Sequence, residues 1–154
     1  MTELRRILLA EDSPEDIELT LAALAEYRLA NQIDVVRDGV EVLDYLYKRG
    51  EYANRPGSRP GVLLLDLKMP RMSGIEVLRH LKSDPVMKTL PIVMLTSSRE
   101  EADIITSYDL GVNAYVVKPV EFRDFMDALR QLGAFWAVLN EVPRASAPIV
   151  RADE

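Results

Sequence analysis

The feature that most constrains this fold is a run of four aliphatic residues, from Val62 to Leu65, that ends in Asp66. Gly61 precedes the run and Met69-Pro70 follows it. A continuous apolar strand of this kind is typical of a parallel sheet that helices cover on both faces. Aspartate is disfavoured in strands, and ligands of open parallel sheets bind just beyond the carboxyl ends of the strands. We therefore expect Asp66 either to carry chemistry at that edge or simply to end the strand.

Strand-like and helix-like segments alternate five times along the chain. Ser13-Pro14 begins the first helix, Asp84-Pro85 stops the third, and Ser98 to Glu101 has the spacing of a capping box. The expected strands are 7–10, 33–36, 62–65, 91–95 and 114–117, and the expected helices are 13–27, 40–49, 74–81, 98–111 and 121–141. This alternation predicts an α/β fold in which five helices flank a five-stranded parallel sheet.

Composition excludes several classes of function. The chain has 154 residues, enough for one domain, a net charge of −6 and no basic block, which argues against nucleic acid or an anionic membrane as partner. No apolar run approaches the ~20 residues of a membrane span. Cysteine is absent and His80 is the single histidine, so thiolate catalysis, disulfides and histidine-based metal sites are excluded or nearly so. These features fit a cytoplasmic protein.

Polar side chains follow four of the five predicted strands, and in a parallel sheet all these strand ends lie at one edge. Three carboxylates there would repel one another unless they shared a hard cation, and Mg²⁺ prefers such oxygen ligands. A lysine and a hydroxyl could meet phosphoryl oxygens. Each residue alone has a plainer interpretation, as a helix cap, a strand-end hydroxyl or a surface lysine. Together they predict phosphoryl transfer onto an aspartate; the residues are Glu11, Asp12, Asp66, Thr96, Ser97 and Lys118.

These motifs, in this order and spacing, resemble the signature of response-regulator receiver domains of two-component signalling. The resemblance covers roughly residues 5 to 140 and rests on Glu11-Asp12, the segment 64–70 with Gly74 behind it, Thr96-Ser97 and 117–119. It implies a flavodoxin-like sheet of order 2-1-3-4-5. It also implies that Asp66 takes a phosphoryl group from a histidine kinase, and that the peptide bond between Lys118 and Pro119 is cis.

The same resemblance implies roles for individual residues. Magnesium would be held by Glu11, Asp12, Asp66 and the main-chain carbonyl of Lys68, and Thr96 and Tyr115 would form the switch pair. Two positions depart from common patterns of the family: Glu11 stands for an aspartate, and Lys68 lies two residues past the acceptor, where it could alter dephosphorylation.

A narrower resemblance points to the single-domain regulators that are paired with bacterial phytochrome histidine kinases. It rests on loop and terminal segments: 38–41, 45–46, 50–56, 82–85, 107–110 and Phe135-Trp136. It implies a phytochrome-type kinase as partner. We expect a receiver domain over 5–142, a flexible tail over 143–154 and no output domain, so that the signal would pass by protein binding or by onward phosphotransfer.

Two other functions compete with the acceptor. An aspartyl-phosphate phosphatase of the haloacid dehalogenase type also places a nucleophilic aspartate after a parallel strand, but it needs a second aspartate two residues later, where Lys68 stands. A receiver used only for docking would not need every acceptor-site residue. We therefore expect a phosphoacceptor and not an enzyme.

The last predicted helix carries two apolar stripes, which one core cannot cover together. The first stripe would face the sheet, whereas the second lies on another side of the helix and invites association. We expect a homodimer built on this C-terminal helix. The first stripe is Phe122, Phe125, Met126, Leu129, Leu132 and Trp136, and the second is Phe135, Val138, Leu139 and Val142.

Overall fold

The computed structural model describes residues 6–26, 32–97, 100, 112 and 114–134. Five parallel strands form one sheet of order β2-β1-β3-β4-β5, as the resemblance implied. The strands are β1 (Ile7–Ala10), β2 (Ile33–Val36), β3 (Val62–Asp66), β4 (Ile92–Thr96) and β5 (Tyr115–Val117). Register is fixed along the central pairs, with Leu64 of β3 beside Leu9 of β1 and Val93 of β4.

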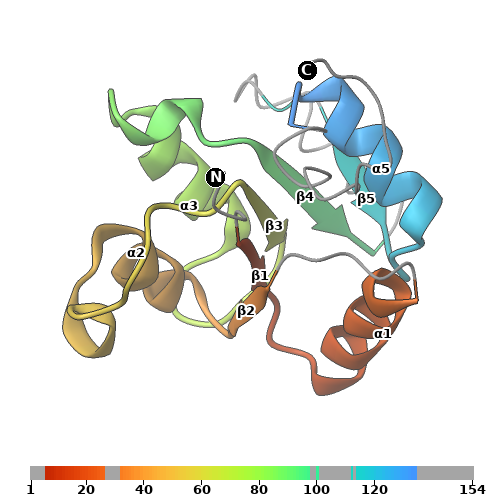
Figure 1. Cartoon of the computed structure of the whole chain (residues 1–154), viewed down its shortest axis with the longest axis horizontal. Coiled ribbons are helices and arrows are strands. Elements are labelled where there is room, and N and C mark those ends of the chain that lie inside the picture. Colours follow the sequence, from red (N-terminus) through yellow and green to blue (C-terminus); the bar gives the residue numbers. More distant parts are fainter. Residues whose placement is uncertain (1–5, 27–31, 98–99, 101–111, 113, 135–154) are drawn as a thin grey trace, which may run out of the picture.

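Four α-helices are described: α1 (Pro14–Ala25), α2 (Gly39–Tyr47), α3 (Gly74–Lys82) and α5 (Phe122–Gln131). In Figure 1, α2 and α3 lie on one side of the sheet and α1 and α5 on the other. The helix expected over 98–111 falls almost wholly outside the described residues, so the prediction of five helices stays a prediction. Two 3₁₀ turns, η1 (Gly50–Tyr52) and η2 (Met87–Thr89), were not predicted.

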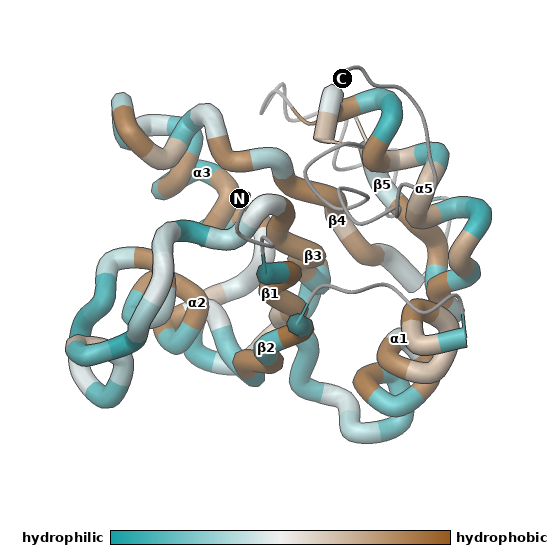
Figure 2. Tube along the Cα trace, viewed as in Figure 1, coloured by the Kyte–Doolittle hydropathy of each residue, from teal (hydrophilic) through white to brown (hydrophobic). Residues whose placement is uncertain are grey.

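The apolar run of β3 contributes to two hydrophobic cores, one on each face of the sheet. Leu63 and Leu65 pack with α2 and α3, whereas Val62 and Leu64 pack with α1 and α5. Successive strand side chains point to opposite faces, so a strand buried on both faces needs an apolar residue at every position. Figure 2 shows the resulting concentration of hydrophobic residues along the central strands.

Side-chain caps fix where three helices begin. Ser13 accepts a hydrogen bond from the backbone N–H of Asp16, and Asp38 accepts one from that of Glu41. Ser73 and Glu76 form a reciprocal capping box at the start of α3. Each cap satisfies backbone donors that the first turn leaves without partners. The caps place these helix N-termini beside the carboxyl ends of β1, β2 and β3.

The predicted length of the last helix is wrong, because α5 ends at Gln131 and not near residue 141. Gly133 has φ 70°, a left-handed conformation that suits glycine. Its N–H donates to the carbonyl of Arg130, and the N–H of Ala134 donates to that of Leu129. These two bonds form the Schellman motif that commonly ends helices. The second apolar stripe and the tail over 143–154 lie outside the described residues.

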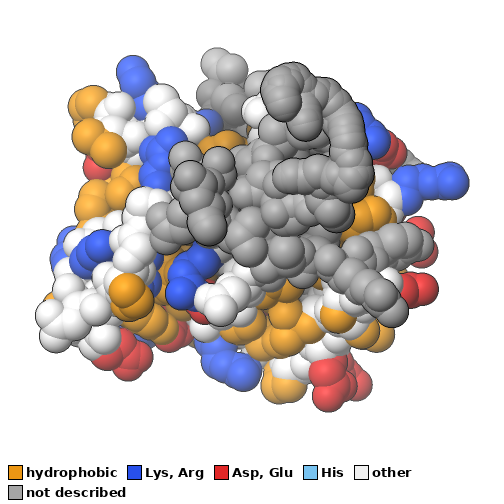
Figure 3. Space-filling view, in the orientation of Figure 1, with side chains coloured by type: hydrophobic (Ala, Val, Ile, Leu, Met, Phe, Trp, Pro, Cys, Tyr) orange, Lys and Arg blue, Asp and Glu red, His pale blue; other side chains and the backbone are white. Residues whose placement is uncertain are grey.

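The surface carries both signs of charge. On the face drawn in Figure 3, the described residues present basic, acidic and apolar side chains side by side. Within the described ranges, no helix combines the length and the apolar character needed to cross a membrane.

Candidate phosphoryl-acceptor site

Residues from four strands meet at the carboxyl edge of the sheet, as predicted. Glu11 and Asp12 follow β1 directly, Asp66 is the last residue of β3, and Thr96 is the last residue of β4. Lys118 follows β5, and its backbone N–H donates to the carbonyl of Thr96 over 2.8 Å. Parallel pairing aligns these strand ends, so groups up to 107 positions apart in sequence come into contact.

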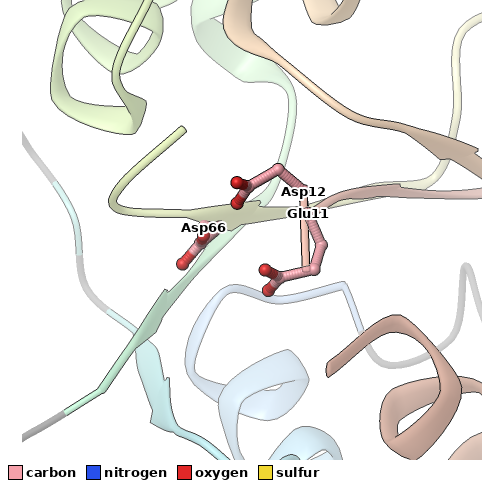
Figure 4. A group of neighbouring side chains, drawn as sticks. All are labelled: Glu11, Asp12 and Asp66. Carbon is pink, nitrogen blue, oxygen red and sulfur yellow. The ribbon is translucent and has the colours of Figure 1, made fainter. Parts of the chain in front are cut away.

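Three carboxylates gather there. One oxygen from each of Glu11, Asp12 and Asp66 lies within 4.8 Å of the others. Figure 4 shows Glu11 and Asp12 rising from the end of β1 beside Asp66 on β3. Glu11 and Asp66 are almost fully buried, whereas Asp12 is exposed. The group is therefore open to solvent on the side of Asp12.

The Lys118 ammonium lies against this acidic group. Its Nζ is 3.2 Å from Glu11 Oε1, 3.2 Å from Asp66 Oδ1 and 2.9 Å from Asp16 Oδ2. An ammonium has three N–H donors, so each donor can meet one carboxylate. Surrounding acids raise the pKa of Lys118 despite its burial, which keeps the ammonium charged.

The charge of the acids is not fully balanced by one lysine. Burial, together with the neighbouring Asp66, raises the pKa of Glu11 from 4.5 to about 7. Burial also raises the pKa of Asp66, although Lys118 opposes that rise. Both shifts mean that the negative charge at this edge is costly without a further cation.

The donor set fits a hard divalent cation. It consists of carboxylate oxygens only, and Mg²⁺ is commonly held by one or two carboxylates with several waters. The exposure of Asp12 leaves room for such waters. Lys68 lies just past β3 with an exposed side chain, and its main-chain carbonyl stays a predicted ligand.

The two predicted switch residues differ in burial. Thr96 is fully buried, whereas Tyr115, at the start of β5, is 39% exposed. The two belong to adjacent strands, but Thr96 pairs with Val117 and not with Tyr115. Ser97 follows Thr96 with an exposed side chain. The expected cis peptide bond between Lys118 and Pro119 is present.

Sequence reasoning missed two features of the site. As an acid in the first turn of α1, Asp16 has a sufficient local explanation in the helix dipole, yet its side chain also contacts the Lys118 ammonium at 2.9 Å. Arg71, a non-glycine residue with φ 65°, makes a two-pronged ion pair with Asp38, the N-cap of α2. That pair ties the loop after Asp66 to the neighbouring helix.

Known proteins share this architecture. The family profile described as "Response regulator receiver domain" matches residues 7–130. Response regulator Rcp1 of Synechocystis sp. is 37% identical over 139 residues, which cover 90% of this chain and 93% of Rcp1. A crystal structure of the Mn²⁺-bound form of Rcp1 covers 94% of this chain and 99% of its own, with a TM-score of 0.67 and 34% identity.

Two phytochrome response regulators of known structure are also similar. The bacteriophytochrome response regulator AtBRR is 58% identical, with a TM-score of 0.87, and covers 91% of this chain and 100% of its own. The phosphorylated cyanobacterial phytochrome response regulator RcpA is 40% identical, with a TM-score of 0.70, and covers 92% of this chain and 100% of its own. The match over residues 7–130, together with the Rcp1 similarity along most of both chains, means that this chain belongs to the response regulator receiver domain family.

Proposed function

We propose that the protein is a phosphoacceptor of two-component signalling, with Asp66 as the acceptor, a histidine kinase as donor and Mg²⁺ as cofactor. The observation that carries this proposal is the position of the Asp66 carboxylate, which lies between two further carboxylates and the Lys118 ammonium. The membership of the chain in the receiver family supports it, as does the phosphorylated state of the similar RcpA structure.

In the proposed reaction, an Asp66 carboxylate oxygen attacks the phosphorus of a phosphohistidine. The new O–P bond forms as the P–N bond breaks, and the imidazole nitrogen keeps the electron pair and takes up a proton. Magnesium, when bound, would neutralise charge on the phosphoryl group, and Glu11, Asp12, Asp66 and the carbonyl of Lys68 would hold it. The Lys118 ammonium, already 3.2 Å from Asp66 Oδ1, would bind a phosphoryl oxygen.

The buried Thr96 hydroxyl and the exposed Tyr115 ring would then report the modification. We propose that Thr96 moves toward the phosphoryl group and that Tyr115 turns inward. The present exposure of Tyr115 supports an outward starting position. The protein itself would not be an enzyme, and its output would be altered protein binding or onward phosphotransfer.

Labelling of Asp66 tests this function. The protein is incubated with phosphoramidate and Mg²⁺, and intact-protein mass spectrometry counts the phosphoryl groups. We expect one group on the wild type and none on Asp66→Asn. Hydroxylamine should remove the group as inorganic phosphate and leave a hydroxamate, because the modification is an acyl phosphate. Asp84→Asn, a change at a surface loop, is the matched control and should label normally. Full labelling of Asp66→Asn, or turnover of a phosphomonoester by the wild type, would contradict the assignment.

The kinase partner is proposed to be of the phytochrome type. This rests on the similarity to AtBRR, RcpA and Rcp1 along nearly the whole chain. Such a pairing would place the protein in the cytoplasm. The net charge of −6 supports the further proposal that neither nucleic acid nor an anionic membrane is a partner. Transfer rates from a panel of phosphorylated kinases of one host test the pairing. A phytochrome kinase should label the protein fastest, and a faster transfer from an unrelated kinase would refute the pairing.

A homodimer through the C-terminal helix and its extension is also proposed. Since α5 ends at Gln131, the second apolar stripe belongs to the segment beyond Gly133 and not to one continuous helix. Ala134 is the last described residue of the buried core, so the truncation is made directly after it, by deletion of residues 135–154. Sedimentation should show a dimer for the full chain and a folded monomer for the truncated one. A full-length monomer at tens of micromolar would exclude the dimer.

A further inference from the structure

We propose that Asp16 is a positioning residue, which holds the Lys118 ammonium in place for the phosphoryl group that Asp66 receives. The inference rests on the proposed acceptor function. It starts from the 2.9 Å bond to Asp16 Oδ2, the shortest of the three that Lys118 Nζ makes with described residues. Asp16 lies in the first turn of α1 and does not belong to the acidic group that could share a cation.

Asp16 is the partner of Lys118 that stays available throughout the reaction. Glu11 and Asp66 are candidate ligands of the cation, and Asp66 also receives the phosphoryl group. Their contacts with Lys118 must therefore loosen or be replaced when the site is loaded. The Asp16 carboxylate has neither task, so its bond can persist in both states and fix one of the three N–H donors of Lys118.

Lysine needs such a fixed point because its stem is long and flexible. The side chain of Lys118 is 13% exposed, and that of Asp16 is 32% exposed. An ammonium near solvent tends to leave for water unless a partner holds it. The backbone of Lys118 is already fixed by its bond to Thr96. With the head group held by Asp16 as well, the donor is in place before the phosphoryl group arrives, as electrostatic stabilisation requires.

The charge of Asp16 has a second, opposite effect. A carboxylate near the site repels an anionic phosphoryl group, so its removal without loss of positioning would strengthen anion binding. Glu15 provides the matched control, because it is an exposed acid in the same first turn of α1. Glu15→Gln removes the same charge from the same helix end, and only Asp16→Asn also removes the ion pair with Lys118, leaving at most a neutral acceptor.

The test measures two affinities of the full-length protein by titration calorimetry. The first is the affinity for Mg²⁺ alone, and the second is the affinity for beryllofluoride at saturating Mg²⁺. We expect Asp16→Asn to weaken beryllofluoride binding by about three- to tenfold relative to Glu15→Gln, the loss suited to a partly exposed, charge-assisted hydrogen bond. Its Mg²⁺ affinity should match that of Glu15→Gln, and Asp16→Glu should recover part of the loss.

Several results would overturn the inference. Asp16→Asn could match Glu15→Gln in both affinities, could strengthen beryllofluoride binding, or could lose it only in proportion to Mg²⁺ binding. Each result would mean that Asp16 affects beryllofluoride binding only through its negative charge or through Mg²⁺ binding, and not by holding Lys118. A wild type that binds no beryllofluoride would refute the acceptor function and this inference together, whereas normal wild-type binding with an unresponsive Asp16→Asn refutes the inference alone.

Discussion

Gly74, the first residue of α3, lies so close to the acceptor strand that a single methyl group should disturb the site. A Cβ at this position would be 2.2 Å from the carbonyl oxygen of Asp66 and 3.0 Å from Leu67 Cα. Both atoms belong to the backbone and cannot rotate away. The N–H of Gly74 also donates to the carbonyl of Leu67, which keeps the two segments in contact. Gly74→Ala must therefore push the backbone of Asp66 or the start of α3 out of place.

The size of the effect follows from this geometry. Overpacking of a well-packed site costs about 1–3 kcal/mol, and the immobile backbone neighbours place this site at the upper end. The better helix propensity of alanine offsets at most about 1 kcal/mol. A net loss of about 2–3 kcal/mol should lower the melting temperature by about 4–12 °C in a chain of this length. A displacement of the acceptor by about 1 Å should slow labelling by about 100-fold.

Substitutions at two other glycines distinguish a loss of fold stability from a displacement of Asp66. A Cβ at Gly39 would be 2.1 Å from the carbonyl oxygen of Met72, so Gly39→Ala should destabilise the fold equally without touching the backbone of Asp66. Gly57 has φ 87°, and no atom lies within 4 Å of the place where the methyl group of an alanine would sit. Gly57→Ala should therefore cost about 1–2 kcal/mol of backbone strain only.

The assay combines thermal unfolding by circular dichroism with the rate of labelling by phosphoramidate. Labelling is measured well below the melting temperature of every variant, so that all are folded. We expect Gly74→Ala alone to lose the labelling rate. An unchanged melting temperature for Gly74→Ala would show that the contact relaxes freely. Equal losses of rate in Gly39→Ala and Gly74→Ala would show that general destabilisation, and not the position of Asp66, controls acceptance.

Three further predictions concern the rest of the fold. Tyr45→Phe removes the hydroxyl that donates to Asp34 and should lower the free energy of unfolding in urea by about 1–2 kcal/mol. Burial, helped by Asp34, raises the pKa of Tyr45 from 10.0 to about 12. The wild type should therefore lose this stabilisation as pH rises through that range, whereas Tyr45→Phe has none to lose. Hydrogen bonds from Tyr47 and two backbone N–H groups lower the pKa of Asp84. The Asp84 carboxylate therefore stabilises the fold fully above pH 3.8, and the difference in unfolding free energy between the wild type and Asp84→Asn should disappear as pH falls below that value. Phe125→Ala empties a fully buried position and should cost about 3–5 kcal/mol by the same urea assay.

Local pattern was enough to predict the sheet and the gathering of the acids. The continuous apolar run before Asp66 already required helices on both faces, and parallel strands necessarily bring their carboxyl ends to one edge. The confirmed convergence of Glu11, Asp66 and Lys118 therefore needed no knowledge of side-chain packing. What it required was only the number and direction of the strands.

The end of α5 shows where periodicity misleads. Apolar residues keep helical spacing across Gly133, so the pattern alone predicts a longer helix. The deciding quantity is the backbone conformation at one residue, because a left-handed glycine lets two N–H groups close the open carbonyls of the last turn. The glycine itself was the available signal, and it outweighs the spacing of the side chains that follow it.

The bond between Asp16 and Lys118 could not be predicted in this way, because it depends on side-chain reach and not on strand direction. The two residues are 102 positions apart, and neither the helix pattern around Asp16 nor the strand before Lys118 indicates how far each side chain extends. An acid in the first turn of a helix has a sufficient local explanation in the helix dipole.

The connection from α2 to β3 likewise combines features that local sequence explains with contacts that depend on side-chain reach. The glycines and prolines of this segment favour turns, and that much needs only local preference. The structure adds that Arg55 stacks 4.0 Å above the ring of Tyr45 and donates to the Tyr45 carbonyl, while Tyr52 meets the same ring edge-on. A cation above an aromatic face is stabilising and directional. The loop is therefore anchored to α2 by side chains that have no local reason to meet, and its shape follows from Tyr45 as much as from its own turn residues.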